Sequence, residues 1–148
     1  MKKNILVTGA TGSVGFEVLK ELCRRIDCYH IRVLSLDTIG ERKILKPFAN
    51  NVEIIWGNIC SLDDVNRAVS GADIVLHLAA IIPPLADQQP KLAFDVNVGG
   101  TRNILLAKRK QPEQPTLIFA SSVSVYGDRV NDPYINVGDP LISSVGDE

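Results

Sequence analysis

Three glycines near the amino end of the chain are spaced for binding a phosphate group. Gly9, Gly12 and Gly15 follow directly on the apolar run over residues 4–8. At a strand-to-helix turn, the first glycine permits the bend, the second lets the backbone approach a pyrophosphate, and the third lets the helix pack on the strand. The free N–H groups and partial positive charge of the helix N-terminus then attract the phosphates. The motif predicts a dinucleotide site; the triplet alone leaves a glycine-rich turn without a ligand as the alternative.

An acidic residue ends the second apolar run, where the adenosine ribose of a dinucleotide is expected to lie. Asp37 is the last residue of the run over residues 31–37. A carboxylate there accepts hydrogen bonds from the ribose hydroxyls and repels a 2′-phosphate, so it favours NAD over NADP. The alternatives are a solvent-exposed strand end and a basic side chain nearby that takes a 2′-phosphate, for which Arg32, Arg42 and Lys43 qualify. We interpret Arg42 and Lys43 as part of a solvated helix face.

Five short apolar runs alternate with longer amphipathic segments, which predicts a parallel sheet covered by helices. We expect strands over residues 4–8, 31–37, 52–56, 73–78 and 116–120, and helices over residues 14–25, 41–46, 62–69 and 90–110. Ser61 and Asp64 have the S-x-x-D spacing of a capping box at the start of the third helix. The default strand order is 3-2-1-4-5, with the ligand at the carboxyl ends of strands 1 and 4. The predicted fold class is α/β, a doubly wound parallel-sheet (Rossmann) NAD-binding domain.

The composition is that of a folded domain of nearly neutral charge. The chain has 148 residues, of which 45% are hydrophobic, and its 16 basic against 17 acidic residues give a formal net charge of −1. This balance argues against a nucleic-acid or membrane-surface partner, which needs a basic excess. No apolar run approaches the roughly 18 residues of a membrane span. The cysteines at positions 23, 28 and 60 are odd in number and lack metal-ligand spacing. We therefore expect a reduced, cytoplasmic protein without a metal site.

Five motifs follow one another along the chain. They are the G-x-x-G-x-x-G spacing over residues 9–15, Gly57-Asn58-Ile59, His77-Leu78-Ala79-Ala80, residues 95–101 (DVNVGGT) and residues 119–127 (FASSVSVYG). In this order the chain resembles the extended short-chain dehydrogenase/reductase family, in particular its NAD-dependent epimerase/dehydratase branch. The match covers nearly the whole chain. One position departs from the family: Asn58 stands where Asp is usual, and an amide can still accept from an adenine amino group or donate to a ring nitrogen.

The resemblance implies a role for each matching position. It implies that Gly9, Gly12, Ser13 and Val14 contact the pyrophosphate, with Gly15 packing behind them, and that Asp37 and Thr38 contact the adenosine ribose. It implies adenine contacts for Asn58 and Ile59, and a lining for the inner face of the cofactor from Leu78, Ala79, Ala80 and Ala120. Asn97 is implied to be a buried amide that supports this region. Ser122 aligns with the catalytic serine of the family. His77 we interpret as a packed strand residue rather than a base.

The catalytic tyrosine and lysine of the family, spaced Y-x-x-x-K, do not occur in these 148 residues. None of the tyrosines at positions 29, 126 and 134 has a lysine four residues later, and the last lysine is Lys110. We expect the N-terminal part of a longer enzyme, truncated after strand 5: a dinucleotide-binding core over residues 1–126 and a loop-rich segment over residues 127–148. Such a chain should be inactive alone, and the apolar edge formed by its fifth strand should favour self-association.

The expected activity of the parent enzyme is hydride transfer between NAD and a hydroxyl or keto group, with a nucleotide sugar as substrate. Two alternatives stay open. One is an NADP-dependent reductase of the same superfamily, and the other is a non-catalytic dinucleotide-sensing module.

Overall fold

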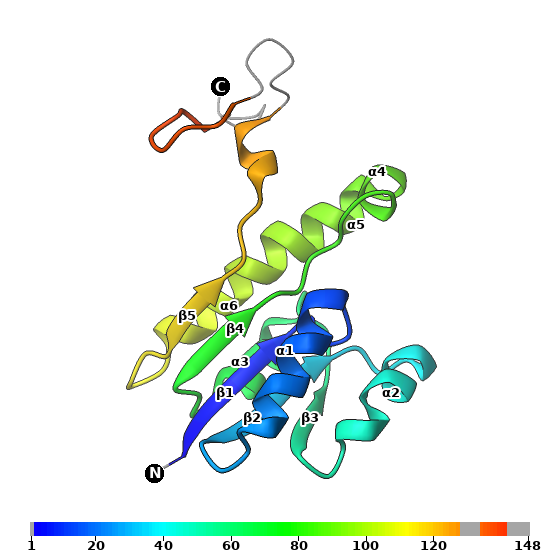
Figure 1. The fold of residues 1–148 in the computed structure, drawn as a ribbon, viewed down its shortest axis with the longest axis vertical. Coiled ribbons are helices and arrows are strands. Elements are labelled where there is room, and N and C mark those ends of the chain that lie inside the picture. The colour runs from blue at the N-terminus through cyan, green and yellow to red at the C-terminus, as the bar shows by residue number, and fades with distance from the viewer. Residues whose placement is uncertain (1, 128–133, 142–148) are drawn as a thin grey trace.

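The computed structural model describes residues 2–127 and 134–141, which form a parallel sheet between two layers of helices (Figure 1). The elements are β1 (Lys3–Thr8), α1 (Ser13–Arg24), β2 (Tyr29–Ser35), α2 (Ile39–Leu45), β3 (Val52–Trp56), α3 (Leu62–Val69), β4 (Ile74–His77), α4 (Leu85–Gln88), α5 (Pro90–Phe94), α6 (Thr101–Arg109) and β5 (Thr116–Phe119), with the short helices η1 (Lys46–Phe48), η2 (Asp95–Gly100) and η3 (Val123–Tyr126). The sheet order is β3-β2-β1-β4-β5. The predicted α/β doubly wound fold and its strand order are confirmed.

The central strand β1 contributes to two cores because successive side chains of a strand point to opposite faces. Ile5 and Val7 pack with Leu19 of α1 on one face. Leu6 packs with Ile104 of α6 on the other. All five side chains are at most 6% exposed. Burying a side chain of this size contributes about 1.5–3 kcal/mol, so the apolar run of β1 fixes the sheet between both helix layers.

Three differences from the predicted elements bear on the site. The strand expected over residues 31–37 is β2 and ends at Ser35, so Asp37 lies beyond it. The helix expected from residue 41 begins at Ile39, because the side chain of Thr38 caps it. The single helix expected over residues 90–110 is divided into α5, the π-helical η2 and α6. Wide turns of this kind are frequent at functional sites, and η2 carries Asn97.

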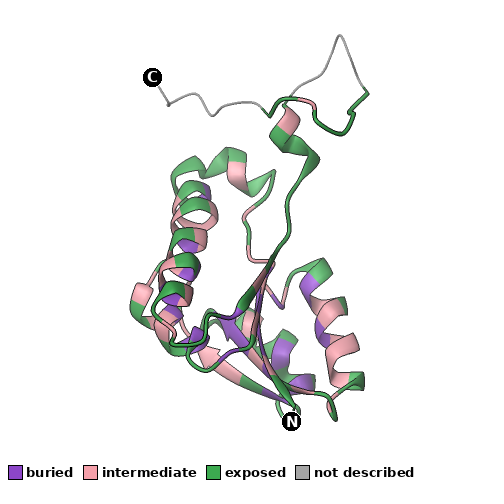
Figure 2. Cartoon of the chain, turned by 90° about the vertical axis from the view of Figure 1, so that its left-hand side faces the viewer, coloured by how far each residue is buried: buried purple, intermediate pink, exposed green. Residues whose placement is uncertain are grey.

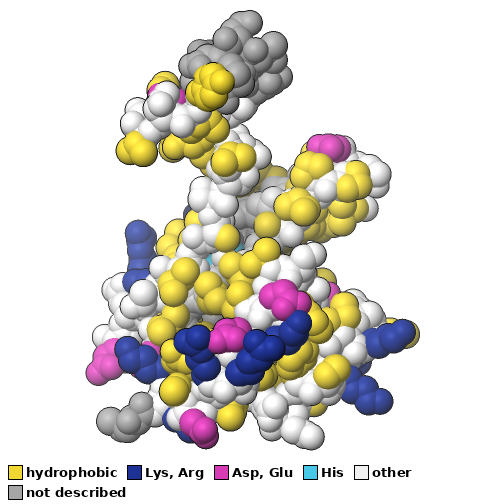
Figure 3. Space-filling view, viewed as in Figure 1, with side chains coloured by type: hydrophobic (Ala, Val, Ile, Leu, Met, Phe, Trp, Pro, Cys, Tyr) yellow, Lys and Arg dark blue, Asp and Glu magenta, His cyan; other side chains and the backbone are white. Residues whose placement is uncertain are grey.

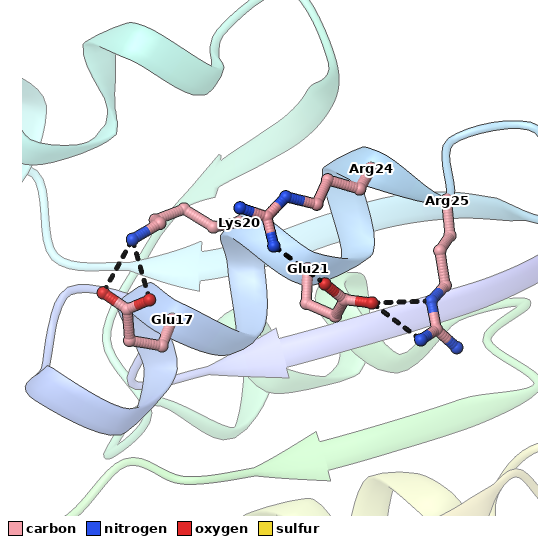
Figure 4. Close-up of polar contacts among 5 residues, drawn as sticks. All are labelled: Glu17, Lys20, Glu21, Arg24 and Arg25. Atoms are coloured by element: carbon pink, nitrogen blue, oxygen red, sulfur yellow. Dashed lines mark hydrogen bonds and ion pairs between the residues drawn. The ribbon is translucent and has the colours of Figure 1, made fainter.

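The outer face of α1 carries charged side chains that pair with one another along the helix. Lys20 bonds Glu17, while Glu21 accepts from Arg25 and Arg24 (Figure 4). Hydrogen bonds from Arg25 and then Arg24 hold the pKa of Glu21 below its ordinary value. Because water screens exposed pairs, they contribute little to stability. In Figure 3 basic and acidic side chains gather across this part of the surface.

The last strand of the sheet is much less covered than the central ones. β5 pairs only with β4, and its side chains are mostly exposed, including Ile118 at 49% and Phe119 at 56%. Beyond it the chain projects away from the helix layers as an exposed segment that includes η3 (Figure 2). The expected apolar character of this edge is confirmed. Among the described residues, no helix has the length and apolar content that crossing a membrane requires.

The loop-rich segment expected over residues 127–148 falls largely outside the described residues. Within it the structure describes residue 127 and residues 134–141, where the chain forms neither a helix nor a strand. Hydrophobic side chains are visible on this part of the molecule and at the end of the α4–α5 arm in Figure 3.

Candidate functional site

The turn between β1 and α1 needs two of its three glycines for the fold itself. Gly9 has a φ of +72°, and a Cβ there would lie 2.6 Å from the backbone nitrogen of Ala79. A Cβ at Gly15 would overlap the carbonyl oxygen of Gly9. By contrast, a Cβ at Gly12 would meet only that same oxygen, at an ordinary 3.5 Å. The contacts within the protein therefore do not require a glycine at position 12, and the space beside it is open to a ligand.

Helix α1 begins at this turn without a side-chain cap. Gly12 is its N-cap residue, no side chain of residues 2–127 or 134–141 caps the first N–H groups, and the first turn contains no acidic residue. The amides of such a helix end carry a partial positive charge and need acceptors from outside the helix. Ser13 and Val14 in this first turn are exposed. The helix end is thus available to an anion, as phosphate binding requires.

A cavity of about 310 Å³ opens beside the turn, at the carboxyl ends of the strands. Its lining comes from the ends of β1 to β4 and from two helices: Thr8, Gly9, Thr11, Gly12, Leu34, Ser35, Leu36, Glu41, Gly57, Asn58, Ile59, Leu78, Ala79, Ala80, Ile81 and Val96. The volume falls within the roughly 300–1,000 Å³ of small-molecule sites. A second cavity, of about 340 Å³, lies at the amino ends of the strands beside Asn4 and His30. Ligands of doubly wound sheets bind at the carboxyl ends, which selects the first cavity.

The side chain of His77 joins the glycine turn to the helix behind it. Thr101 donates its hydroxyl proton to the carbonyl of Asn97 at 2.6 Å, so it can only accept from Nε2 of His77, 2.9 Å away. The neutral ring then accepts at Nδ1 from Thr8, whose oxygen lies at 2.7 Å and itself accepts from the Ala79 amide. Burial lowers the pKa of His77, which keeps the ring neutral. The expectation that His77 is a packed strand residue is confirmed.

Asn97 acts on the cavity through the backbone of Ile81. Its amide oxygen accepts from the Ile81 N–H at 2.8 Å, and its amide nitrogen donates to the Ile81 carbonyl at 2.9 Å. Ile81 lines the cavity, whereas Asn97 does not. The π-helical turn of η2 directs the Asn97 side chain to the loop after β4, where the paired bonds hold the cavity wall in place.

The turn after β3 places the side-chain amide of Asn58 at the cavity, with its oxygen bonded within the turn. The side-chain oxygen of Asn58 accepts from the backbone N–H of Cys60 at 2.9 Å, and the backbone N–H of Asn58 donates to Asp64 at the same distance. The Asp64 N–H donates to the Ser61 hydroxyl, but the Ser61 N–H donates to the Asn58 carbonyl at 2.9 Å and not to Asp64, so the expected capping box is only half formed. The bond from the backbone N–H of Asn58, followed by one from the Arg67 side chain, lowers the pKa of Asp64. Among the described residues nothing bonds the NH₂ group of Asn58, which is therefore available to a ligand.

The two acidic residues that follow β2, Asp37 and Glu41, differ in what their side chains contact. Asp37 accepts both hydrogen bonds of the Arg42 guanidinium, at 2.5 and 2.8 Å, and Arg42 also lies over the ring of Trp56. Arg42 is exposed on α2, as expected of a solvated helix face, and its side chain also reaches back over the strand end to Asp37 and Trp56. The bond from Arg42 lowers the pKa of Asp37. Asp37 does not line the cavity, whereas Glu41 of α2 does.

Comparison with known proteins places this geometry in a family. The chain matches the 3-beta hydroxysteroid dehydrogenase/isomerase family over residues 6–141. It belongs to this family. It is similar to the UDP-N-acetyl-alpha-D-glucosaminuronate decarboxylase of Bacillus cytotoxicus, with 32% identity over 86% of this chain and 39% of the relative. An uncharacterized epimerase/dehydratase of Staphylococcus aureus is 31% identical over 93% of this chain and 43% of its own length. The resemblance to the epimerase/dehydratase branch is confirmed.

A solved structure of the same superfamily carries a cofactor. The chain superimposes with a TM-score of 0.71 and 30% identity on a short-chain dehydrogenase/reductase superfamily protein from Agrobacterium tumefaciens with bound NAD. The alignment covers 94% of this chain and 39% of that one. The chain thus spans about two fifths of the length of the family members that it matches.

The residues expected from this family to contact a cofactor divide into two groups. The group that lines the cavity is Gly9, Gly12, Asn58, Ile59, Leu78, Ala79 and Ala80. The group that does not is Ser13, Val14, Gly15, Asp37, Thr38, Asn97, Ala120 and the expected catalytic Ser122. Thr38 uses its hydroxyl to cap α2. Nine lining residues were not expected to contact the cofactor: Thr8, Thr11, Leu34, Ser35, Leu36, Glu41, Gly57, Ile81 and Val96. Of these, the strand ends Thr8 and Ser35 could have been found from their position alone.

Ser122 caps a short helix in the projecting segment. Its hydroxyl oxygen accepts from the Ser124 N–H at 3.1 Å and lies 3.0 Å from the Ser124 hydroxyl. Both serines are exposed. The described contacts of Ser122 are therefore local, and they hold its side chain against η3.

Proposed function

We propose that this chain is the NAD-binding part of an NAD-dependent epimerase/dehydratase that acts on a nucleotide sugar. The observation that carries the proposal is the cavity at the carboxyl ends of the strands, bordered by Gly12 and by an uncapped helix end. Pyrophosphate is an anion that such a site suits, since backbone amides and the helix dipole both favour it. The NAD seen in the solved relative supports the choice of cofactor.

The residues present fit a dinucleotide in their chemistry. Gly12 leaves room for a phosphate, and the amides of the first turn of α1 supply donors. The NH₂ group of Asn58 suits a ring nitrogen of adenine, because its oxygen is already engaged by Cys60. When bound, the nicotinamide supplies hydride acceptance and donation. Ala79 and Ala80 expose small apolar surfaces that accommodate a flat ring and exclude water.

We also propose the substrate class, and the names of the relatives support it. The Bacillus relative is a UDP-sugar decarboxylase by its name, which favours a nucleotide sugar. The description of the matched family favours a second candidate, a hydroxysteroid-like alcohol. The two substrates need different groups in the site, because a nucleotide sugar carries a charged diphosphate whereas a steroid has a largely apolar skeleton.

Proton transfer requires residues that these 148 positions do not supply. The Y-x-x-x-K pair does not occur in the sequence, so we propose that the chain binds NAD without turning over a substrate. Reading the gene beyond codon 148 tests this directly. A following Y-x-x-x-K supports the enzyme reading, and assays of that longer protein with a UDP-sugar and a 3-hydroxysteroid separate the two substrate classes. A stop codon favours a non-catalytic dinucleotide-sensing module.

Calorimetric titration of the chain with NAD⁺ tests the cofactor. Wild type should bind, and Gly12→Val should lose binding because the new side chain fills the phosphate position. Gly99→Ala is the matched control, since a Cβ there meets nothing within 4 Å and Gly99 does not line the cavity. Folded wild-type chain that takes up no NAD⁺ would contradict the proposal, as would equal binding by the Gly12 variant.

A further inference from the structure

The turn after β3 is held from behind by α6, a helix that contributes no residue to the lining of the cofactor cavity. The turn covers residues 57–60, and Gly57, Asn58 and Ile59 line the cavity. Behind it lies the junction of η2 and α6 at Gly100 and Thr101. The role inferred below for this junction rests on the proposed NAD-binding function, because the adenine is expected at this turn.

Three contacts join the turn to η2 and α6. The side-chain nitrogen Nδ2 of Asn103 donates to the Ile59 carbonyl at 3.0 Å. Gly100 packs so closely on the Ile59 side chain that a Cβ at Gly100 would lie 3.0 Å from Ile59 Cγ2. The Cys60 thiol donates to the Asp95 carbonyl at 3.5 Å. The backbone and the side chain of Ile59 are thus both fixed from the helix side.

The same turn is also bonded to α3. The side chain of Asp64 accepts from the backbone N–H of Asn58 at 2.9 Å. Helices α3 and α6 share one hydrophobic core, in which Val65 and Ile104 are fully buried. The turn therefore lies between two helices that pack on each other, and Asn103 supplies a side-chain hydrogen bond to it from α6.

We infer that Asn103, which lies outside the cavity, is a positioning residue for the adenine of the cofactor. By holding the Ile59 carbonyl, it fixes the direction in which the neighbouring Asn58 presents its side-chain NH₂ group. The oxygen of that amide already accepts from the Cys60 N–H, so the NH₂ group is the part that meets a ring nitrogen of adenine. Hydrogen bonds weaken steeply when the donor is misaligned, and a donor held in place before binding loses less freedom. Loss of the Asn103 amide therefore weakens recognition of the base more than binding of the rest of the dinucleotide.

The test compares NAD⁺ with nicotinamide hypoxanthine dinucleotide by calorimetry. In hypoxanthine the ring nitrogen N1 carries a hydrogen, so it cannot accept from the NH₂ group of Asn58. The wild-type chain should prefer NAD⁺ by about tenfold, the value of one hydrogen bond. Asn103→Leu removes the donor at similar volume and should reduce this preference to about twofold or less. A general loss of stability would lower both affinities and leave their ratio unchanged.

Gln111→Leu is the matched control. The side-chain amide of Gln111 also donates to a backbone carbonyl, that of Ala107 at 3.3 Å, but at the far end of α6. This variant should keep the wild-type ratio within about twofold, since no bond to the turn is lost. Asn103→Asp keeps the shape of the side chain and replaces the donating NH₂ group by an oxygen, so it should lose the preference as Asn103→Leu does. It decides the test if the leucine variant does not fold, which thermal melts reveal.

Three results would overturn the inference. One is equal binding of the two dinucleotides by the wild-type chain. Another is a preference for NAD⁺ that survives in a folded Asn103 variant, and a third is an equal loss of preference in Gln111→Leu. A wild-type chain that binds neither dinucleotide is a distinct outcome: it overturns the proposed function and the role of Asn103 with it.

Discussion

The glycine turn after β1 and the segment after β5 both follow the carboxyl ends of parallel strands, but the chain holds them very differently. Gly9 packs against the backbone of Ala79, and Thr8 is bonded to His77. Ser122, in the segment after β5, has its described hydrogen bonds with Ser124, two residues away. The first region is built by contacts between distant parts of the chain, and the second by local contacts. The turn that borders the cavity is therefore organised by contacts with distant residues, whereas the described contacts of Ser122 are local.

The cause of this difference lies in the position of each strand in the sheet. β1 lies between β2 and β4 and is covered on both faces, so its end is fixed from every side. β5 lies at the edge, where Leu117 packs into a core while Ile118 and Phe119 remain about half exposed. A parallel sheet positions a ligand group well only where both neighbours are present, and here that condition holds at β2, β1 and β4.

The largest expected effect comes from Gly15→Ala. Its Cβ would overlap the Gly9 carbonyl oxygen, so α1 would have to move away from β1. Such a shift disrupts the packed core, and we expect a loss above about 3 kcal/mol in the free energy of unfolding. Chemical denaturation followed by circular dichroism measures it. Gly99→Ala, with open space around its Cβ, should change stability by less than about 0.5 kcal/mol; equal losses in both variants would contradict the account of the turn.

Thr101→Val tests the buried chain of hydrogen bonds. The variant removes the acceptor of His77 and the donor to Asn97 while keeping nearly the same volume. Leaving buried polar groups unpaired costs about 1–3 kcal/mol. Thr116→Val is the matched control in the other region, because Thr116 is exposed on β5. A variant at Thr101 as stable as the one at Thr116 would show that the two regions are held equally.

Stability should depend on pH through His77. Burial lowers its pKa in the folded chain below the ordinary value, so the unfolded chain binds more protons near pH 6 to 7. The contribution of His77 to the free energy of unfolding should therefore be fully present above about pH 7 and decrease as the pH falls toward about 5. Melting temperatures across that window measure the slope. In His77→Asn the slope should flatten; an unchanged slope would mean that other groups cause it.

We propose that the exposed edge at β5 drives self-association of this chain, and Ile118→Lys tests it. A charge on an edge strand discourages pairing with another sheet. Sedimentation should show less association in the variant, with stability changed by less than about 0.5 kcal/mol. Leu105→Lys, on α6 and 41% exposed, serves as the control. A monomeric wild-type chain, or equal effects of both substitutions, would count against β5 as the contact.

The smallest effect is expected from Ser122→Ala. Its described bonds are with Ser124, and it does not line the cavity. NAD⁺ affinity should therefore stay within about twofold of wild type, since no ligand contact is lost. A clear loss of affinity in calorimetry would show that the segment after β5 reaches the cofactor.

The sequence was sufficient for the features that depend on backbone pattern. The strand order follows from alternating apolar runs, and the sites of Gly9 and Gly12 follow from the strand-to-helix spacing. The directions of Asp37, Arg42 and Glu41 could not be predicted, because they depend on how one helical turn places long side chains against the end of β2. The bond from Asn97 to Ile81 was also out of reach, since it requires the π-helical turn of η2.

Amide shift mapping in a ¹⁵N-labelled chain titrated with NAD⁺ tests the central claim most directly. If the cofactor lies at the carboxyl ends of β1 to β4, the resonances of Gly9, Gly12, Asn58 and Ala79 should move, while those of Ser122 and Ser124 should not. Shifts concentrated at Asn4 and His30, beside the cavity at the opposite ends of the strands, would contradict it. So would shifts that centre on the segment after β5.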